Sequence, residues 1–345
     1  MLFRLARPII HALDAERAHQ WTVRALGATP LRRPQALDPR LAIRVAGIEF
    51  PGPVGLAPGF DKNAQVAWQM LGLGFAFAEV GTVTPLPQAG NPRPRLFRLQ
   101  EDRAVINRMG FNNDGATDVV ERLAARADAP GIVGVNIGAN KDSPDRVADY
   151  AKITGIMAPL ARYLTVNISS PNTPGLRALQ DRGALDALLA AVIQARGTIA
   201  CPVFLKLAPD LEPADIDDIC KVAIDRGLDA LIISNTTISR PPLGSVHAGE
   251  SGGLSGAPLA SLALARLQDF RRASGGAIPL IGVGGIETAK DAYRRIRAGA
   301  SLVQLYSALV YEGPGLARRI HRELVDLLDR DGFATLADAV GADAR

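Results

Sequence analysis

The chain has 345 residues, of which 48% are hydrophobic and 21% are charged, and this composition excludes a disordered chain and provides for a sizeable core. The formal net charge is only +4, and aromatic residues make up only 5%, so a dedicated nucleic-acid surface is not expected. No apolar run reaches the roughly 18 residues that a membrane-spanning helix needs.

The first 40 residues predict two short amphipathic helices ahead of the main fold, at about 2–12 and 15–26. Asp14 is a suitable N-cap for the second helix, and Gly27 is a suitable stop at its end. We therefore expect a helical extension that forms a unit of its own, residues 1–40.

The start of this extension is apolar but is interrupted by Arg4 and Arg7, and it lacks the continuous apolar stretch and cleavage site of a signal peptide. Amphipathic helices with basic residues favour a place on a membrane surface, with the arginines toward the lipid headgroups. Helices that are simply packed under the main fold are the alternative.

Eight short apolar or β-branched runs follow, and helical segments rich in Ala and Leu separate most of them. Continuously apolar strands suit a parallel sheet that is covered on both faces. Eight such units in roughly 250 residues fit a closed (β/α)8 barrel better than an open sheet. We therefore predict an α/β fold, a TIM barrel of residues 41–345. The expected strands are 53–58, 75–83, 132–138, 163–169, 203–208, 230–236, 279–285 and 301–307.

Two intervals between these runs are long for a simple crossover. Residues 84–131 begin with a Pro- and Arg-rich stretch that predicts a hairpin, followed by a helix. Residues 237–262 are rich in Gly and predict a lid or ligand-binding loop.

Polar residues gather at the carboxyl ends of the expected strands, where barrels of this kind carry their working sites. Each of them alone is compatible with a simple turn, but the repetition favours a binding site. Asparagines suit a flat ligand with amide edges, Lys62 offers a charge for a carboxylate, and the glycines of 282–285 let backbone N–H groups approach a phosphate. The strand-end residues are Lys62, Thr82, Asn136, Asn167, Ser170, Lys206, 234–237, 282–285 and 306–307.

Lys206 lies in an otherwise apolar strand, where a charge is costly unless it meets an opposite charge. The anionic edge of a reduced flavin would supply that charge, and a lysine–carboxylate pair inside the barrel is the alternative. No histidine follows a strand near Ser170, so a hydrolase triad lacks its base. A serine can itself act as a base where hydride transfer to a flavin pulls the reaction forward. The two cysteines and four dispersed histidines show no metal-ligand spacing, so no metal is expected.

Several long motifs carry a resemblance to a known family. They are "GLAPGFDKN" (55–63), "EVGTVTPLPQAGNPRPRLFRL" (79–99), "INRMGFNN" (106–113), "VNISSPNTPGLRALQ" (166–180), "LKLAPD" (205–210) and "IGVGGI" (281–286). Together they resemble the quinone-dependent (class 2) dihydroorotate dehydrogenases, which are FMN enzymes of pyrimidine biosynthesis. Ser170 stands at the base position, where cytosolic class 1 relatives have a cysteine, and the N-terminal extension also indicates class 2.

The resemblance implies that dihydroorotate is oxidised to orotate, with one FMN per chain and ubiquinone or menaquinone as the final acceptor. It implies that Ser170 takes the C5 proton while the C6 hydride goes to flavin N5. Thr173 is placed to relay or orient a proton, and Ser169 is interpreted as structural. The implied substrate set is Lys62, Asn107, Arg108, Met109, Gly110, Phe111, Asn167, Asn172, Asn235 and Thr236. The implied FMN set is Ala57, Pro58, Gly59, Thr82, Asn136, Asn167, Lys206, Ser234, Gly256, Gly285, Tyr306 and Ser307.

In this family the extension caps a tunnel that admits the quinone, and His19 and Arg98 are our candidates for its polar end. An interhelical contact is the alternative for His19, and neutralisation of the flavin phosphate or of a carboxylate is the alternative for Arg98. The resemblance also implies a monomer, attached peripherally to the cytoplasmic side of the inner membrane through an anionic lipid surface. Two other functions stay open: a related FMN barrel that uses fumarate or NAD, and a non-catalytic phosphate-binding barrel on a membrane.

Overall fold

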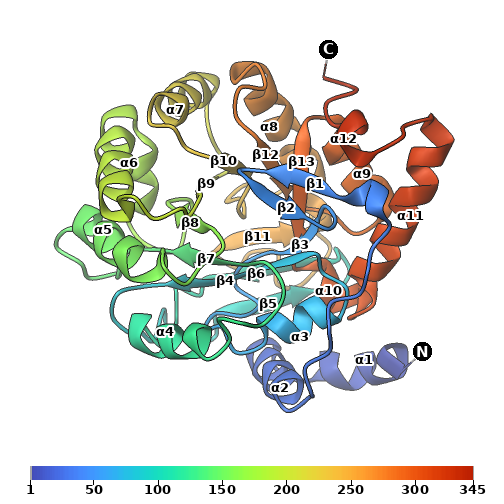
Figure 1. The fold of residues 1–345 in the computed structure, drawn as a ribbon. Helices are drawn as coiled ribbons and strands as arrows, with labels where there is room; N and C mark the ends of the chain where they lie inside the picture. The colour runs from blue at the N-terminus through green and yellow to red at the C-terminus, as the bar shows by residue number, and fades with distance from the viewer. Residues whose placement is uncertain (1, 345) are drawn as a thin grey trace.

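Eight parallel strands close into a barrel in the computed structural model, which describes residues 2–344, the side chains of residues 2, 4–6 and 9 excepted (Figure 1). Each of the eight predicted runs overlaps one barrel strand, so the predicted TIM barrel is confirmed. The order around the barrel is β10-β12-β13-β3-β4-β7-β8-β9. The strands are β3 Val54–Leu56, β4 Phe77–Val83, β7 Val133–Ile137, β8 Leu164–Asn167, β9 Val203–Leu207, β10 Ala230–Ile233, β12 Leu280–Val283 and β13 Ala300–Leu305.

Aromatic side chains fill the amino-terminal half of the barrel. Tyr163 stacks on Phe204 with ring centroids 4.6 Å apart, and Gly134 makes room for Tyr163, because a Cβ there would lie 2.2 Å from its ring. A short hairpin that the sequence analysis missed, β1 (Ile43–Val45) with β2 (Ile48–Phe50), covers this end. Its Phe50 packs edge-on against Phe77 at the start of β4, with centroids 5.0 Å apart.

The helices that follow the strands surround the barrel (Figure 1). Their starts follow ordinary capping chemistry: Thr288 and Asp291 form a capping box at α9, and Asp145 caps α5. The helices are α3 Ala67–Gly72, α4 Ala116–Ala124, α5 Arg146–Met157, α6 Arg182–Arg196, α7 Pro213–Asp225, α8 Ala260–Ala273, α9 Ala289–Arg297, α10 Ala308–Glu312, α11 Leu316–Asp331 and α12 Leu336–Ala339.

The two long intervals meet in one small sheet. The first forms the expected hairpin, β5 (Leu96–Leu99) with β6 (Ala104–Asn107), before α4. The second contributes strand β11 (Gly253–Gly256), which pairs antiparallel with β6 and gives the order β11-β6-β5. This sheet has its own apolar cluster, which includes Phe97, Ile106 and Leu254. The Gly-rich interval is therefore anchored as a strand at one end, which the prediction of a loop did not include.

The extension forms α1 (Leu2–Ala12) and α2 (Ala15–Gly27), in agreement with the predicted helices, and Asp14 caps α2 by accepting a hydrogen bond of 2.9 Å from the backbone N–H of Arg17. The two helices lie together beside the barrel, below it in Figure 1. The expected orientation of Arg4 lies outside the described side chains. Within the described chain, no helix combines the length and the apolar character that crossing a membrane requires.

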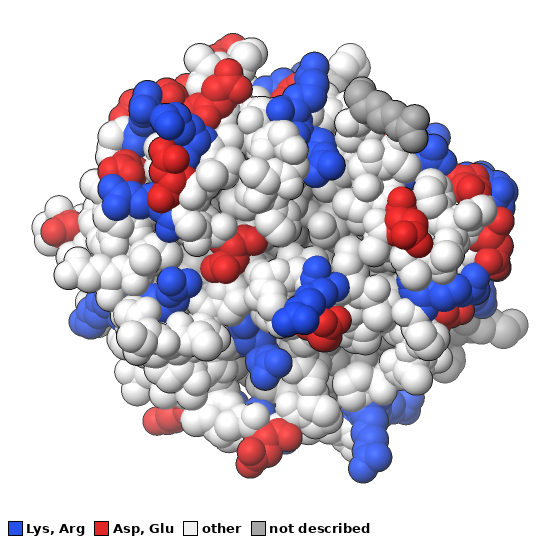
Figure 2. All heavy atoms as spheres, turned by 45° about the horizontal axis from the view of Figure 1, so that its top comes forward, with Lys and Arg blue, Asp and Glu red and all other residues white. Residues whose placement is uncertain are grey.

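Charged side chains are spread over the surface. On the face shown in Figure 2, Lys and Arg are interspersed with Asp and Glu, and neither sign forms a continuous patch. Within residues 2–344, no three His, Cys, Asp or Glu side chains are placed to hold a metal ion. Both cysteines, Cys201 and Cys220, are free and buried.

Candidate active site

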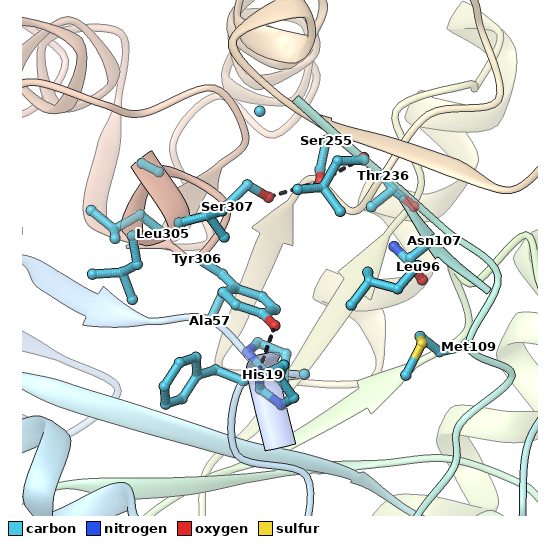
Figure 3. A pocket seen from close by; sticks show the side chains of 18 of the residues that line it. His19, Ala57, Leu96, Asn107, Met109, Thr236, Ser255, Leu305, Tyr306 and Ser307 are labelled. Carbon is cyan, nitrogen blue, oxygen red and sulfur yellow. Dashed lines mark hydrogen bonds between the residues drawn. The ribbon is translucent and has the colours of Figure 1, made fainter. Parts of the chain in front are cut away.

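A cavity of about 430 Å³ lies between the carboxyl ends of the barrel strands, the small sheet and the two N-terminal helices. Figure 3 shows its interior, with Tyr306 pointing toward His19 and with Asn107, Met109 and Thr236 on another wall. All the predicted site residues except Arg108 and Asn136 line it. They are His19, Ala57, Pro58, Gly59, Lys62, Thr82, Arg98, Asn107, Met109, Gly110, Phe111, Asn167, Ser170, Asn172, Lys206, Ser234, Asn235, Thr236, Gly256, Gly285, Tyr306 and Ser307.

A chain of polar side chains crosses the floor of this cavity. Thr82 donates to Asn136 Oδ1 at 2.5 Å, and Asn167 Nδ2 donates to the same oxygen at 3.0 Å and to Thr82 Oγ1 at 3.1 Å. Ser169 then donates to Asn167 Oδ1 at 2.7 Å and accepts from Asn235 Nδ2 at 2.8 Å. Ser169, interpreted as structural from the sequence, therefore joins two of the predicted site amides.

Ser170 follows this chain on the loop after β8 and is 5% exposed. Its Oγ accepts a hydrogen bond of 3.2 Å from the backbone N–H of Asn172, and no described side chain hydrogen-bonds to it. Asn172 Nδ2 reaches across to the Asn107 carbonyl at 3.1 Å and so ties the loop to β6. Thr173 is buried, and its hydroxyl has no partner among the described residues. The loop thus holds two hydroxyls without a neighbouring base.

Lys206 is 4% exposed on β9, and no described residue forms an ion pair or hydrogen bond with its ammonium group. Burial lowers its pKa, and the negative charge of Glu79 opposes that shift. Glu79 is fully buried on β4 and was missed by the sequence analysis, although it is an acidic residue within an apolar run. The alternative of a direct lysine–carboxylate pair is therefore reduced to a longer-range attraction.

Lys62 lies on the loop after β3 and donates to the Gly59 carbonyl at 2.7 Å. The loop is shaped by Asp61, whose carboxylate accepts from the backbone N–H groups of Gln65 at 2.9 Å and Val66 at 2.7 Å. Burial lowers the pKa of Lys62 to about 8. An ammonium group in this position gains strongly from an anionic ligand, because the ligand restores the lost solvation.

Two glycines on the cavity wall, near β11 and β12, pack closely against neighbouring backbone. Gly256 has φ +97° and Gly285 has φ +65°, and a Cβ would lie 2.4 Å from the Arg103 carbonyl at the first and 2.4 Å from Ala260 at the second. Any other residue would therefore force the backbone away at both places. Beside them, Ser255 and Ser307 hydrogen-bond to each other at 2.8 Å, so backbone and hydroxyl groups line the wall together.

Two predicted site residues do not reach the cavity. Arg108 turns its side chain outward, where it forms an ion pair of 2.7 Å with Glu250 and lies 4.6 Å from the centre of the Phe97 ring. Asn136 is fully buried and contacts the site only through Asn167 and Thr82. The structure thus does not bring the guanidinium group of Arg108 to the other predicted residues.

The ring of His19 contacts two aromatic side chains of the barrel. Its Nδ1 lies 3.4 Å from the hydroxyl of Tyr306, and its ring packs edge-on against Phe60 with centroids 5.4 Å apart. Burial, followed by the positive charge of Lys62, lowers the pKa of His19 to about 3, so the imidazole is neutral at neutral pH. A neutral imidazole can both donate and accept a hydrogen bond.

Arg98 binds the extension through its backbone. Its guanidinium group donates to the carbonyl of Ile10 at 2.9 Å and to the carbonyl of Leu13. These are carbonyls at the end of α1 and in the turn before α2, so Arg98 fastens that turn over the cavity. Sequence reasoning did not consider this role.

The fold and the site together define a class: an α/β-barrel enzyme with a deep cavity at the carboxyl end of its barrel, polar at the barrel floor and apolar at the other end. Residues 40–328 match the family described as Dihydroorotate dehydrogenase. Two curated relatives named dihydroorotate dehydrogenase (quinone) are similar over 99% of this chain. The one from Novosphingobium aromaticivorans is 67% identical with 99% of its length covered, and the one from Sphingopyxis alaskensis is 66% identical with 97% covered.

Solved structures agree. A crystal structure of DHODH from Eimeria tenella in complex with ferulenol has a TM-score of 0.91 at 40% identity, over 96% of both chains. The ligand-free form from the same organism also has a TM-score of 0.91, at 41% identity. The chain belongs to the dihydroorotate dehydrogenase family, in its quinone-dependent class, and is an oxidoreductase.

Proposed function

We propose that this chain oxidises dihydroorotate to orotate in pyrimidine biosynthesis, with FMN bound in the barrel and a membrane quinone as the final electron acceptor. One observation carries this proposal. A single cavity joins Ser170, Lys206 and the amide-lined barrel floor to an apolar end that is lined by α1 and α2. The first end suits a polar substrate and a cofactor, and the second suits an apolar acceptor.

The residues present fit FMN. Lys206 is a buried ammonium group without a direct partner among the described residues, as the anionic N1/O2 edge of a reduced flavin requires. The glycine backbone at Gly256 and Gly285, with Ser307 beside it, suits the phosphate. When bound, FMN supplies the chemistry of accepting a hydride and passing on the electrons one or two at a time.

Ser170 is the proposed base. Because its Oγ accepts only a backbone N–H bond, a lone pair remains for the C5 proton of the substrate. Its burial excludes water from that proton transfer. The hydroxyl of Thr173, three residues further along the chain and buried without a partner among the described residues, is the group that we propose to receive or orient the proton that leaves Ser170.

Lys62 and the amides are proposed to hold the substrate. Lys62 matches the carboxylate, and burial makes that contact stronger than it would be in water. Asn107, Asn172 and Asn235 line the same cavity, and each offers amide groups to a ring with amide edges. The resulting specificity is for a flat, anionic ring.

The extension is proposed to dock on an anionic membrane and to admit ubiquinone or menaquinone, with His19 and Arg98 at the polar end of the path. Trp21 on α2 is 59% exposed and Leu31 is 41% exposed, as expected of side chains that enter the lipid interface. We propose a monomer bound peripherally to the cytoplasmic side of the inner membrane, with residues 1–40 and 41–345 as its two units.

The test is a pair of half-reactions. Purified protein is expected to carry a flavin absorbance spectrum that dihydroorotate bleaches and that quinone restores, with ping-pong kinetics overall. Protein without flavin, or flavin that dihydroorotate leaves oxidised, would refute the proposal. Reoxidation by fumarate or NAD faster than by quinone would assign the other acceptor class, and loaded flavin with no turnover would leave only a binding barrel.

A further inference from the structure

Glu79 is the least expected charge in the barrel. It is fully buried on β4, and no lysine or arginine among the described residues forms an ion pair with it. Its carboxylate accepts three hydrogen bonds: from Asn136 Nδ2 at 2.8 Å, from Gln304 Nε2 at 2.6 Å and from the Tyr163 hydroxyl at 3.2 Å. A buried carboxylate is costly, so a role is expected for it.

A carboxylate only accepts, and this fixes the direction of the amides beside it. Because Asn136 turns its Nδ2 to Glu79, its Oδ1 faces Thr82 and Asn167. Asn167 must then present its own Nδ2 to that oxygen, and its Oδ1 faces the hydroxyl of Ser169.

The same direction continues to the loop after β10. The Ser169 hydroxyl donates its proton to Asn167, so it accepts from Asn235 Nδ2 at 2.8 Å. Asn235 Oδ1 then accepts the backbone N–H of Thr236 at 2.9 Å. Reversing any one of these groups would set two donors or two acceptors against each other, which leaves a buried group unpaired.

A second series of hydrogen bonds starts from the other carboxylate oxygen of Glu79. Gln304, which lines the cavity from β13, gives its Nε2 to Glu79 and therefore turns its Oε1 away. That oxygen is buried and has no partner among the described residues. The carboxylate thus sets the amide orientation on both sides of the cavity floor.

We propose that Glu79 is a positioning residue that sets the hydrogen-bonding direction of Asn136, Asn167, Asn235 and Gln304. Through them it fixes which donors and acceptors face the substrate and the cofactor. This inference rests on the proposed function, since it assigns the direction of the same site. Glu79 itself touches neither ligand, because Asn136 and Gln304 lie between.

The test exchanges the carboxylate and the amide in the hydrogen bond between Glu79 and Asn136. Glu79→Gln places an amide N–H against the donor of Asn136 or, if the new amide turns over, against the donor of Gln304. Adding Asn136→Asp restores an acceptor there, because the amide introduced at position 79 then donates to the carboxylate introduced at position 136. The other oxygen of that carboxylate still accepts from Thr82 and Asn167. The double variant therefore keeps one carboxylate and one amide and the original direction. Glu49→Gln is the matched control, because Glu49 lies exposed on β2.

The main readout is the dissociation constant of orotate, which is measured from the change that orotate causes in the flavin spectrum. The second readout is the rate at which dihydroorotate reduces the flavin in a single turnover. We expect Glu79→Gln to weaken orotate binding and slow reduction by roughly 10- to 100-fold, the equivalent of one unpaired buried group. The double variant is expected to regain most of both, and the control to match the unmodified protein.

Three results would overturn the inference. They are a Glu79→Gln variant that binds orotate like the unmodified protein, a double variant no better than the single one, and a double variant that folds no better where the single one fails to fold. Failure of the proposed function is distinguishable, since the unmodified protein itself would then not be bleached by dihydroorotate.

Discussion

The two ends of the cavity are built on different principles. At the barrel end, Thr82, Asn167, Ser169 and Asn235 hydrogen-bond to one another, and the amides have fixed directions. At the other end, the lining is mostly apolar. It includes Phe3, Ile10, Ala15, Ala18, Leu26 and Leu309. A polar site needs fixed geometry for proton and hydride transfer, whereas an apolar opening needs only to exclude water and accept a flexible apolar molecule.

The ends are nevertheless connected through the segment before β5. Glu16 of α2, which is buried, forms ion pairs with Arg95 at 2.8 Å and with Arg93 at 3.0 Å. Arg95 also donates to the carbonyl of Asn91 at 2.7 Å, and the Asn91 side chain donates to the carbonyl of Asn172 at 3.1 Å. The extension is thus tied to the loop that carries Ser170 by a short series of polar contacts.

The largest effect is expected from a substitution that disables only the barrel end of the cavity. Ser170→Ala is expected to retain FMN but to slow flavin reduction by dihydroorotate by about 10²–10⁴-fold, the usual contribution of a general base. Stopped-flow bleaching measures the rate, and reoxidation by quinone is expected to be unchanged. Ser261→Ala, at an exposed position of α8, is the control. A reduction rate close to that of the unmodified protein would remove Ser170 from the role of base.

The next largest effect is expected from a substitution in the N-terminal extension, at the apolar end of the cavity. Glu16→Gln removes the charge from its pair with Arg95, in which both residues are 5% exposed, and breaking such a pair is costly because the buried charge of Arg95 is left without an opposite charge. We expect quinone-dependent reoxidation to fall by roughly tenfold, the equivalent of about 1.4 kcal/mol, while bleaching by dihydroorotate changes less than reoxidation does. Glu49→Gln again serves as the exposed control. Equal losses in both half-reactions would mean that the two ends are not separable.

The same pair gives a pH dependence. Burial raises the pKa of Glu16, but the hydrogen bonds and charges of Arg95 and Arg93 outweigh it and hold the pKa below its ordinary value. A lowered pKa in the folded state contributes stability that is present above the ordinary pKa and is lost as the pH falls through the folded-state pKa. Protonation of Glu16 removes the same charge that Glu16→Gln removes. The rate of flavin reoxidation by quinone is therefore expected to fall more steeply on acidification in the unmodified protein than in Glu16→Gln.

A smaller effect tests Lys62. Because burial lowers its pKa to about 8, the free protein loses the ammonium charge as the pH rises through that value. Orotate affinity is expected to be constant well below that pKa and then to fall, by up to about tenfold for each further pH unit. Lys62→Arg keeps its charge and is expected to abolish this fall. A dissociation constant that stays flat well above the pKa in the unmodified protein would show that Lys62 does not bind the carboxylate.

Sequence periodicity was sufficient for the barrel, because its strands are continuously apolar and are bounded by Gly and Pro. It was insufficient for β1, β2 and β11, which have three or four residues each. The first two pair only with each other in a short hairpin, and β11 finds its partner β6 through a tertiary contact. The strand-end residues were predictable for the same topological reason. Glu79 and Asn91 were not, since each acts through groups that are distant in sequence: the side chain of Gln304 for Glu79, 225 positions away, and the backbone carbonyl of Asn172 for Asn91, 81 positions away.

Arg108 is where the resemblance and the geometry differ, and it carries the smallest expected effect. Its guanidinium group is held outward by Glu250 and by the ring of Phe97, so substitution removes a partly exposed ion pair and not a substrate contact. Such pairs contribute about 0–1 kcal/mol, and Arg108→Ala is therefore expected to change the KM for dihydroorotate by less than about fivefold.

Glu250→Ala provides the matched comparison, because it breaks the same ion pair from the other side. If the pair only anchors the loop before β11, the two variants are expected to have similar kinetics. If Arg108→Ala instead raises the KM by more than about tenfold while Glu250→Ala leaves it unchanged, then the arginine turns inward when substrate binds. The polar end of the cavity would in that case include a movable cation. Fixed side-chain geometry would then no longer distinguish the polar end from the apolar end.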